Sequence, residues 1–91
     1  MIAVRVRVTG LVQGVWYRGW AVDEANARGL NGWVRNRRDG SVEALFCGPD
    51  QAVSDMIEAC RRGPHAARVD ALTQEEAEAP AEAGFHQSPT D

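Results

Sequence analysis

The spacing of apolar residues changes repeatedly along the chain, and the order of these changes constrains the fold more than any other feature. Within residues 2–9, valines alternate with arginines, which is typical of a strand with one buried face. Residues 15–28 then place apolar side chains at helical spacing, and Gly29 is suited to end that helix. The chain is therefore predicted to begin with a strand followed by a helix.

Two further strands and a second helix follow the first pair. Residues 30–37 and 41–47 are strand-like, and the Asp-Gly pair that ends at Gly40 favours a tight hairpin turn between them. Pro49 is typical of a first helical position, and apolar residues then recur every three or four positions. Gly63, which precedes another proline, is expected to end this helix.

The last part of the chain carries a weaker pattern. Residues 66–73 predict a fourth strand, and a further short strand is possible around Phe85. The resulting order predicts the α+β ferredoxin-like split βαβ sandwich, an antiparallel sheet with two helices on one face. We expect a single domain over residues 1–91, with a compact core at about 2–73 and an acidic, partly ordered tail at 74–91.

The charged residues are distributed unevenly. All ten basic residues are arginine and seven of them lie in the first 40 positions, although the net charge of the chain is −3. A basic first half suits an anionic ligand. Cys47 and Cys60 stand alone, which argues against a metal site and predicts free thiols in a reducing compartment. No stretch resembles a signal peptide or a membrane span, so we expect a cytoplasmic protein without membrane contact.

The loop after the first strand is the strongest candidate for a functional site. In a split βαβ fold the first two strands run parallel, so the loop 10–18 and Asn36 should meet at one edge of the sheet. Gly10 and Gly14 flank a turn into a helix, and backbone amides at such a position form an anion-binding concavity. Arg18 adds a guanidinium suited to phosphate oxygens. The alternative is a tight turn followed by a surface arginine.

Three segments resemble the acylphosphatases. These are GLVQGVWYR at 10–18, GLNGWVRNRRDGSVEALFCGP at 29–49 and GPHAARVD at 63–70, and the resemblance covers roughly residues 3–72. It implies a metal-independent hydrolase without a cofactor, acting on the carboxyl-phosphate anhydride of small acyl phosphates.

The resemblance also implies roles for particular residues. Arg18 would bind the phosphoryl group, and Asn36 would orient the attacking water. The backbone amides of the phosphate-binding loop would share the binding, and its residues are Leu11, Val12, Gln13, Gly14, Val15, Trp16 and Tyr17. Because an amide can orient water but cannot act as a base, the proton of that water would pass to the substrate.

Two other functions remain open at this point. One is a non-catalytic or regulatory module that only binds phosphate or other anions, although Asn36 favours the enzyme because pure anion binding needs no water-orienting amide. The other is nucleic-acid binding, which the predicted strand 41–47 disfavours because it carries one aromatic and no basic residue. We expect a monomer that binds no nucleic acid and for which inorganic phosphate competes with the substrate.

The sequence also predicts roles for other side chains near the loop. Trp16 and Tyr17 are candidates for the wall of an acyl pocket, whereas Trp20 is expected to pack in the core. Ala21 stands where related sequences often have threonine, and Gly19 is predicted to loosen the loop because glycine disfavours helix.

No other nucleophile stands out in the sequence. His65 and His86 have no serine or cysteine at a suitable spacing, so we expect surface histidines. Cys47 has no sequence sign of an activating base.

Overall fold

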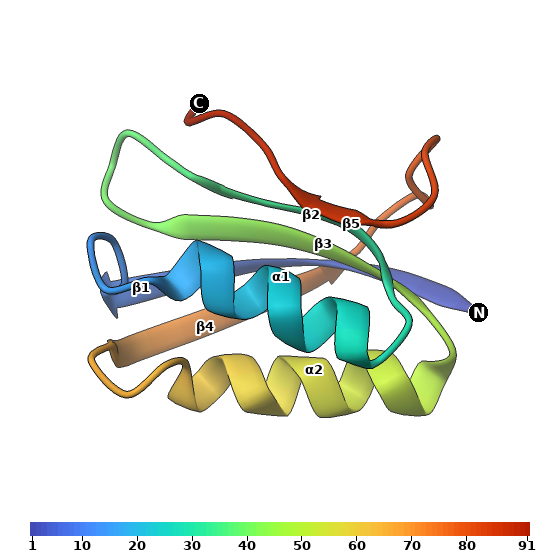
Figure 1. Cartoon of the computed structure of the whole chain (residues 1–91), viewed down its shortest axis with the longest axis horizontal. Helices are drawn as coiled ribbons and strands as arrows, with labels where there is room; N and C mark the ends of the chain where they lie inside the picture. The colour runs from blue at the N-terminus through green and yellow to red at the C-terminus, as the bar shows by residue number, and fades with distance from the viewer.

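Five strands and two helices follow one another in the predicted order in a computed structural model that describes residues 1–91. Both helices lie against the same face of a single sheet (Figure 1). The fold is therefore α+β and ferredoxin-like, as the sequence predicts. The elements are β1 (Ile2–Leu11), α1 (Tyr17–Ala27), β2 (Asn31–Asn36), β3 (Val42–Gly48), α2 (Asp50–Arg62), β4 (Arg68–Glu76) and β5 (Phe85–Gln87).

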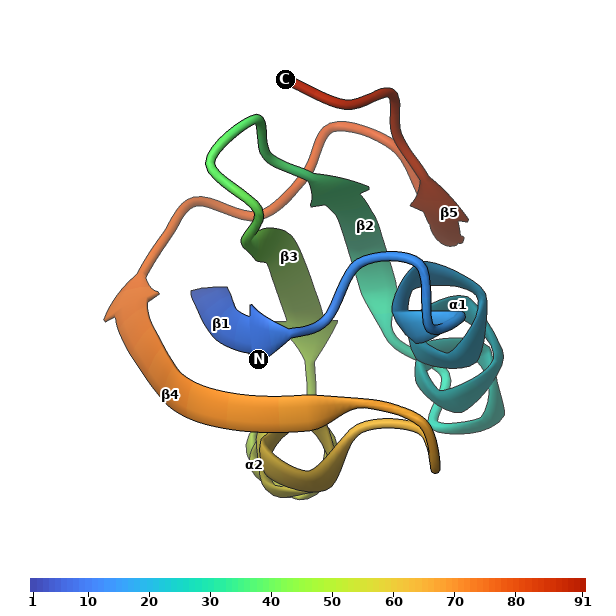
Figure 2. The same ribbon diagram turned by 90° about the vertical axis from the view of Figure 1, so that its left-hand side faces the viewer.

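The sheet has the strand order β4-β1-β3-β2-β5. The first four strands in this order pair antiparallel, as predicted, whereas β5 pairs parallel with β2, so the sheet is mixed. The reason lies in the segment 77–84, which crosses the sheet on the side away from the helices (Figure 2). This segment begins beside Ala3, at the start of β1, and ends beside Gly32, at the start of β2. The last strand can then run only in the direction of β2.

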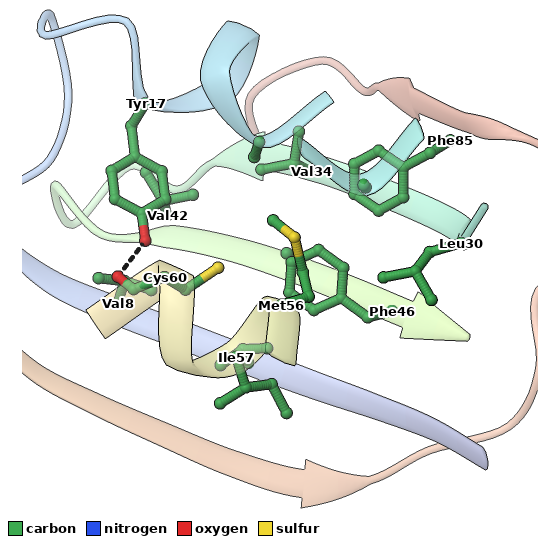
Figure 3. Packing of buried hydrophobic residues seen from close by; sticks show 14 of the residues in the cluster. Val8, Tyr17, Leu30, Val34, Val42, Phe46, Met56, Ile57, Cys60 and Phe85 are labelled. Carbon is green, nitrogen blue, oxygen red and sulfur yellow. Dashed lines mark hydrogen bonds between the residues drawn. The ribbon is translucent and has the colours of Figure 1, made fainter. Parts of the chain in front are cut away.

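A single hydrophobic core fills the space between the sheet and the helices. Helix α2 contributes the regular stripe that the sequence predicts, with Val53, Met56, Ile57 and Cys60 buried. Helix α1 packs mainly on β2 and β5, and α2 packs on β1, β3 and β4. Figure 3 shows how side chains from both layers meet between the elements.

The end of the chain takes part in this core. Phe85 of β5 is buried, and its ring stacks on Phe46 of β3 with 5.4 Å between the ring centroids. Backbone hydrogen bonds continue beyond β5, because the N–H of Ser88 donates to the carbonyl of Val34 and the N–H of Asp91 donates to that of Asn36. The tail thus supports the strand that carries Asn36.

Candidate active site

The sheet topology brings two distant segments to one edge. Strands β1 and β2 each pair antiparallel with β3, so they run in the same direction and end at the same edge of the sheet. The loop that leaves β1, the start of α1 and the turn after β2 lie together at that edge, on the left of Figure 1. The segment 77–84 crosses at the opposite end, so it leaves this edge uncovered.

A cavity of about 230 Å³ lies at this edge. Arg18 and Asn36 both line it, which confirms the predicted meeting of the loop with the end of the second strand. No aspartate, glutamate or histidine is among its lining residues, which are Val12, Gly14, Trp16, Tyr17, Arg18, Gly19, Asn36 and Gln87.

The backbone amides of the loop are available to a ligand. None of the N–H groups from Gln13 to Gly19 donates a hydrogen bond within the protein, and the first helical bond runs from the N–H of Trp20 to the carbonyl of Trp16. Gly14 and Trp16 have φ angles of 75° and 67°, which turn this segment sharply into α1. Free amides at the positive end of a helix dipole attract an anion.

The side chain of Gln13 holds the loop against the neighbouring hairpin. Its Nε2 donates to the carbonyl oxygens of Arg37 and Ser41, at 2.8 Å and 2.9 Å. Because Arg37 follows Asn36 directly, these hydrogen bonds connect the loop to the strand end that carries the candidate water-orienting residue. From the sequence, only the backbone amide of Gln13 was expected to take part in the site.

Arg18 is the second residue of α1 and has a half-buried side chain. Its guanidinium forms no salt bridge and no hydrogen bond with the protein, whereas Arg5, Arg7, Arg35 and Arg37 all pair with carboxylates. A guanidinium without a protein partner at the wall of a cavity can present its whole fork of donors to a phosphate group.

Asn36 contributes a side-chain amide to the lining of the cavity. Its Oδ1 atom is buried and has no hydrogen-bond partner in the protein, the one buried side-chain polar atom in that condition. An unsatisfied buried acceptor costs about 1–3 kcal/mol, so it marks a place where a bound group restores the missing hydrogen bond. The position suits a water molecule or a substrate donor.

Tyr17, a candidate for the wall of an acyl pocket, also has a structural role. Its side chain is only 2% exposed, and its hydroxyl donates a 2.6 Å hydrogen bond to the carbonyl oxygen of Cys60 in α2 (Figure 3). Burial raises the pKa of Tyr17 far above its ordinary value. The hydroxyl is therefore neither free nor acidic enough for proton transfer at the cavity, and its ring anchors the start of α1.

The other predicted loop residues take different positions. Leu11 still belongs to β1 and pairs with Arg68, so it precedes the turn. Val12 is fully buried, and Val15 packs against the core. The side chains of Val12 and Val15 thus anchor the loop on the core.

Two further residues line the cavity besides the predicted loop residues and Asn36. Gln87 lines the cavity from β5, the short strand that was possible around Phe85. No sequence pattern connected Gln87 with the site. Gly19 lies directly against the indole of Trp16, a close contact that the sequence did not predict. The unusual glycine in the first helical turn was the available signal.

The remaining candidate nucleophiles lie outside the cavity. His65 and His86 are exposed, as predicted, and Cys47 is buried on β3 as a free thiol. No group of three or more His, Cys, Asp or Glu side chains is arranged to hold a metal ion. None of the helices has the length and apolar character needed to cross a membrane.

Comparison with known families gives a consistent result. The family model described as Acylphosphatase matches residues 4–87. The chain belongs to the acylphosphatase family. An acylphosphatase from Rhodospirillum rubrum is 57% identical over 90 residues, which cover 99% of each chain. One from Rhizorhabdus wittichii is 53% identical over 98% of this chain and 90% of its own.

A solved structure of the acylphosphatase family supports the same assignment. The crystal structure of acylphosphatase from Bacillus subtilis matches with a TM-score of 0.91 and 36% identity, and the match covers 97% of this chain and 99% of that one. The resemblance predicted from the three sequence segments is thus confirmed, and so is the ferredoxin-like fold.

Proposed function

We propose that this chain hydrolyses acyl phosphates in the cavity formed by the loop after β1, with Arg18 and Asn36 as its catalytic residues. The observation that carries this proposal is the convergence of three unpartnered groups on one cavity. These groups are the unpaired amides of the lining residues Gly14 and Trp16 to Gly19, the guanidinium of Arg18 and the buried Oδ1 of Asn36. They match the needs of a phosphoryl group and of an attacking water molecule.

The phosphoryl group of the substrate is the part that this site binds. Its oxygens would accept hydrogen bonds from the loop amides and from the fork of Arg18, and the helix dipole of α1 adds to the positive potential. The same groups stabilise the charge that spreads over the phosphoryl oxygens in the transition state. Among the loop residues predicted from the sequence, the amides of Leu11 and Val12 remain the least supported, because Leu11 lies within β1.

The attacking water is positioned by Asn36. A water O–H donates to Oδ1, and the water oxygen approaches phosphorus in line with the bond to the acyl oxygen. The new P–O bond forms as the old one breaks, and the carboxylate leaves with the bonding electron pair. Holding both reactants in this geometry replaces much of the entropy cost of a reaction between two free molecules.

The proton of the water passes to the substrate itself. The only titratable side chains at the cavity are Arg18 and Tyr17, and the hydroxyl of Tyr17 is occupied by Cys60. No protein group can therefore act as a general base. A phosphoryl oxygen accepts the proton, so the products are a carboxylate and inorganic phosphate, and the loop retains its charge throughout.

Further properties belong to the same proposal. Inorganic phosphate, as a product, competes for the loop amides and Arg18, and other small oxyanions do the same. The reaction needs neither a metal ion nor a cofactor. The chain acts as a monomer in the cytoplasm, where its two free cysteines stay reduced.

The test is hydrolysis of acetyl phosphate and benzoyl phosphate in the presence of EDTA. We expect turnover by the unaltered chain, and a loss of at least about 100-fold in kcat/KM for Arg18→Ala and for Asn36→Ala, the range found when a preorganised donor is removed. Asn36→Asp is also expected to be impaired, because a second negative charge would face the phosphoryl group.

Matched controls keep this result specific. Arg38→Ala removes an exposed arginine from the turn after β2, and Asn26→Ala removes an exposed asparagine from α1; both should retain activity. Phosphate binding, measured by calorimetry, should disappear in Arg18→Ala. Phosphate binding without any turnover of either substrate would instead identify a non-catalytic binding module.

A further inference from the structure

Trp16 combines exposure with an unusual backbone conformation. Its side chain is 62% exposed, although it lines the cavity, and its φ of 67° places a bulky residue in the left-handed region. Such a conformation is uncommon outside glycine, asparagine and aspartate, and it concentrates at functional sites. The residue is held there as the cap of α1, with no side-chain hydrogen bond to stabilise it.

Gly19 provides the seat for the indole of Trp16. A Cβ atom on Gly19 would lie 2.1 Å from Nε1 and 2.6 Å from Cδ1 of the indole, so any larger residue would force the ring to move. Glycine in the first turn of a helix is unfavourable compared with alanine. Glycine at this position lowers the helix propensity of α1 but leaves room for the indole to lie close to the backbone.

The apolar surface available to a substrate is concentrated on this ring. The other apolar residues of the cavity, Val12 and Tyr17, are buried, so neither can offer a face to a ligand. If water attacks from the side of Asn36, the acyl group must leave on the opposite side of phosphorus. The exposed indole of Trp16, which lines the cavity, is the apolar surface that such an acyl group would meet.

We infer that Trp16, seated on Gly19, forms a subsite that binds flat aromatic acyl groups of the substrate. This inference rests on the proposed function and adds a substrate class to it. The indole contacts the acyl group by stacking or by an edge-to-face contact, which favours a benzoyl group over an acetyl group. In this arrangement the loop amides bind the phosphoryl group, and the indole contacts the acyl group.

The test compares kcat/KM for benzoyl phosphate with kcat/KM for acetyl phosphate in several variants. Trp16→Ala should lower this ratio roughly five- to tenfold, the range expected for the loss of one aromatic contact. Trp16→Asn should do the same, because asparagine tolerates the left-handed conformation and so keeps the turn. Trp16→Phe should retain most of the ratio.

Gly19→Ala provides an independent variant in which the indole is still present. The substitution favours the helix, so folding is preserved, but its Cβ displaces the ring. The ratio should fall about as far as in Trp16→Ala, by roughly five- to tenfold. Trp33→Leu is the matched control, because this tryptophan packs against Arg35 on the opposite face of the sheet and should leave the ratio unchanged.

The outcomes separate the subsite from the function on which it rests. If the unaltered chain hydrolyses both substrates and the ratio stays within twofold in Trp16→Ala and Gly19→Ala, the subsite is overturned and the proposed function stands. If the rates with both substrates fall equally, Trp16 only shapes the loop, and the subsite is again overturned. If the unaltered chain hydrolyses neither substrate, the proposed function fails and the subsite with it.

Discussion

The side-chain amide of Gln13 donates a 2.8 Å hydrogen bond to the main-chain carbonyl oxygen of Arg37. The same amide group donates a second bond to the carbonyl of Ser41. Both carbonyls also accept a hydrogen bond from the hairpin itself, since the N–H of Gly40 donates to Arg37 and the N–H of Arg37 donates to Ser41. Gln13 is thus an added connection between the loop and the hairpin, and the hairpin does not depend on it for its own structure.

This arrangement predicts that Gln13→Ala affects activity more than stability. The free energy of unfolding should decrease by about 1–2 kcal/mol, because each carbonyl keeps one partner. kcat/KM for benzoyl phosphate should fall by about tenfold or more, because small displacements between reacting groups are costly in rate. Urea unfolding and steady-state kinetics provide the two measurements.

Gln51→Ala is the control for this prediction, since its side chain is exposed and bonds only to Asp55 within α2. It should change neither quantity appreciably. An unchanged kcat/KM in Gln13→Ala would show that the loop keeps its position without this connection.

On the face of the sheet away from the helices, we expect the side chain of Glu43 to stabilise the folded state. Its side chain is 7% exposed, and it accepts hydrogen bonds from Arg35 and Arg37 while Arg5 and Arg7 lie within 3.9 Å. Removing one partner of a buried ion pair typically costs about 3–5 kcal/mol. We expect the lower end of this range here, because each of the four arginines keeps a second carboxylate partner, Glu75, Asp39 or Asp91. Glu43→Ala should therefore lower the free energy of unfolding by about 3 kcal/mol, and added salt should restore part of it because it screens the repelling guanidinium groups.

Glu58→Ala offers a comparison with an exposed pair. Glu58 bonds to Arg61 at the surface of α2, so its removal should cost less than about 1 kcal/mol. A similarly small cost for Glu43→Ala would mean that the four arginines are solvated well enough without the shared carboxylate.

The order of the elements could be predicted from the sequence because the buried strands and helices carry clear periodicity. The exact first and last residues of the helices and strands were harder to predict. The first helix begins at Tyr17 and not at residue 15, because residues before it adopt loop angles that polarity does not reveal. β4 extends to Glu76 through pairing with β1, although its last residues are all exposed and carry no apolar signal.

The two catalytic candidates could also be predicted, because topology alone brings Arg18 and Asn36 to one edge. Other parts of the site depend on side-chain contacts across the fold. The bonds of Gln13 to the hairpin join residues 24 and 28 positions apart, and no local pattern encodes them. The contact of Trp16 with Gly19 similarly needs the left-handed angle at Trp16, which the sequence does not show.

Because β5 packs on the core through Phe85, we expect both stability and activity to depend strongly on this residue. Phe85→Ala removes a buried ring that stacks on Phe46, and substitutions of this kind cost about 3–5 kcal/mol. Activity should fall as well, because β5 carries Gln87 and pairs with the strand of Asn36. Urea unfolding and kcat/KM measure the two effects.

His86→Ala is the matched control, since its side chain is the exposed neighbour of Phe85 in the same strand. Its free energy of unfolding should lie within about 0.5 kcal/mol of that of the unaltered chain, as is usual for substitutions at surface positions. A loss of less than about 1 kcal/mol in Phe85→Ala would show that β5 contributes little to the folded state.

Burial of Cys60 predicts a loss of stability at alkaline pH. Burial raises the pKa of its thiol from about 9 to about 12, so the folded state keeps the proton that the unfolded chain loses. The contribution is complete below about pH 9 and disappears as the pH rises toward 12, with a slope of up to about 1.4 kcal/mol per pH unit. Tyr17 acts in the same direction above pH 10, because burial also raises its pKa.

Cys60→Ala should therefore show a flatter dependence of the unfolding free energy on pH between 9 and 12. The cavity left by the thiol lowers stability by the same amount at every pH, so the comparison rests on the slope and not on the absolute value. Equal slopes in the unaltered chain and in Cys60→Ala would show that another group controls unfolding at high pH, and Tyr17→Phe would then test the hydroxyl that bonds to Cys60.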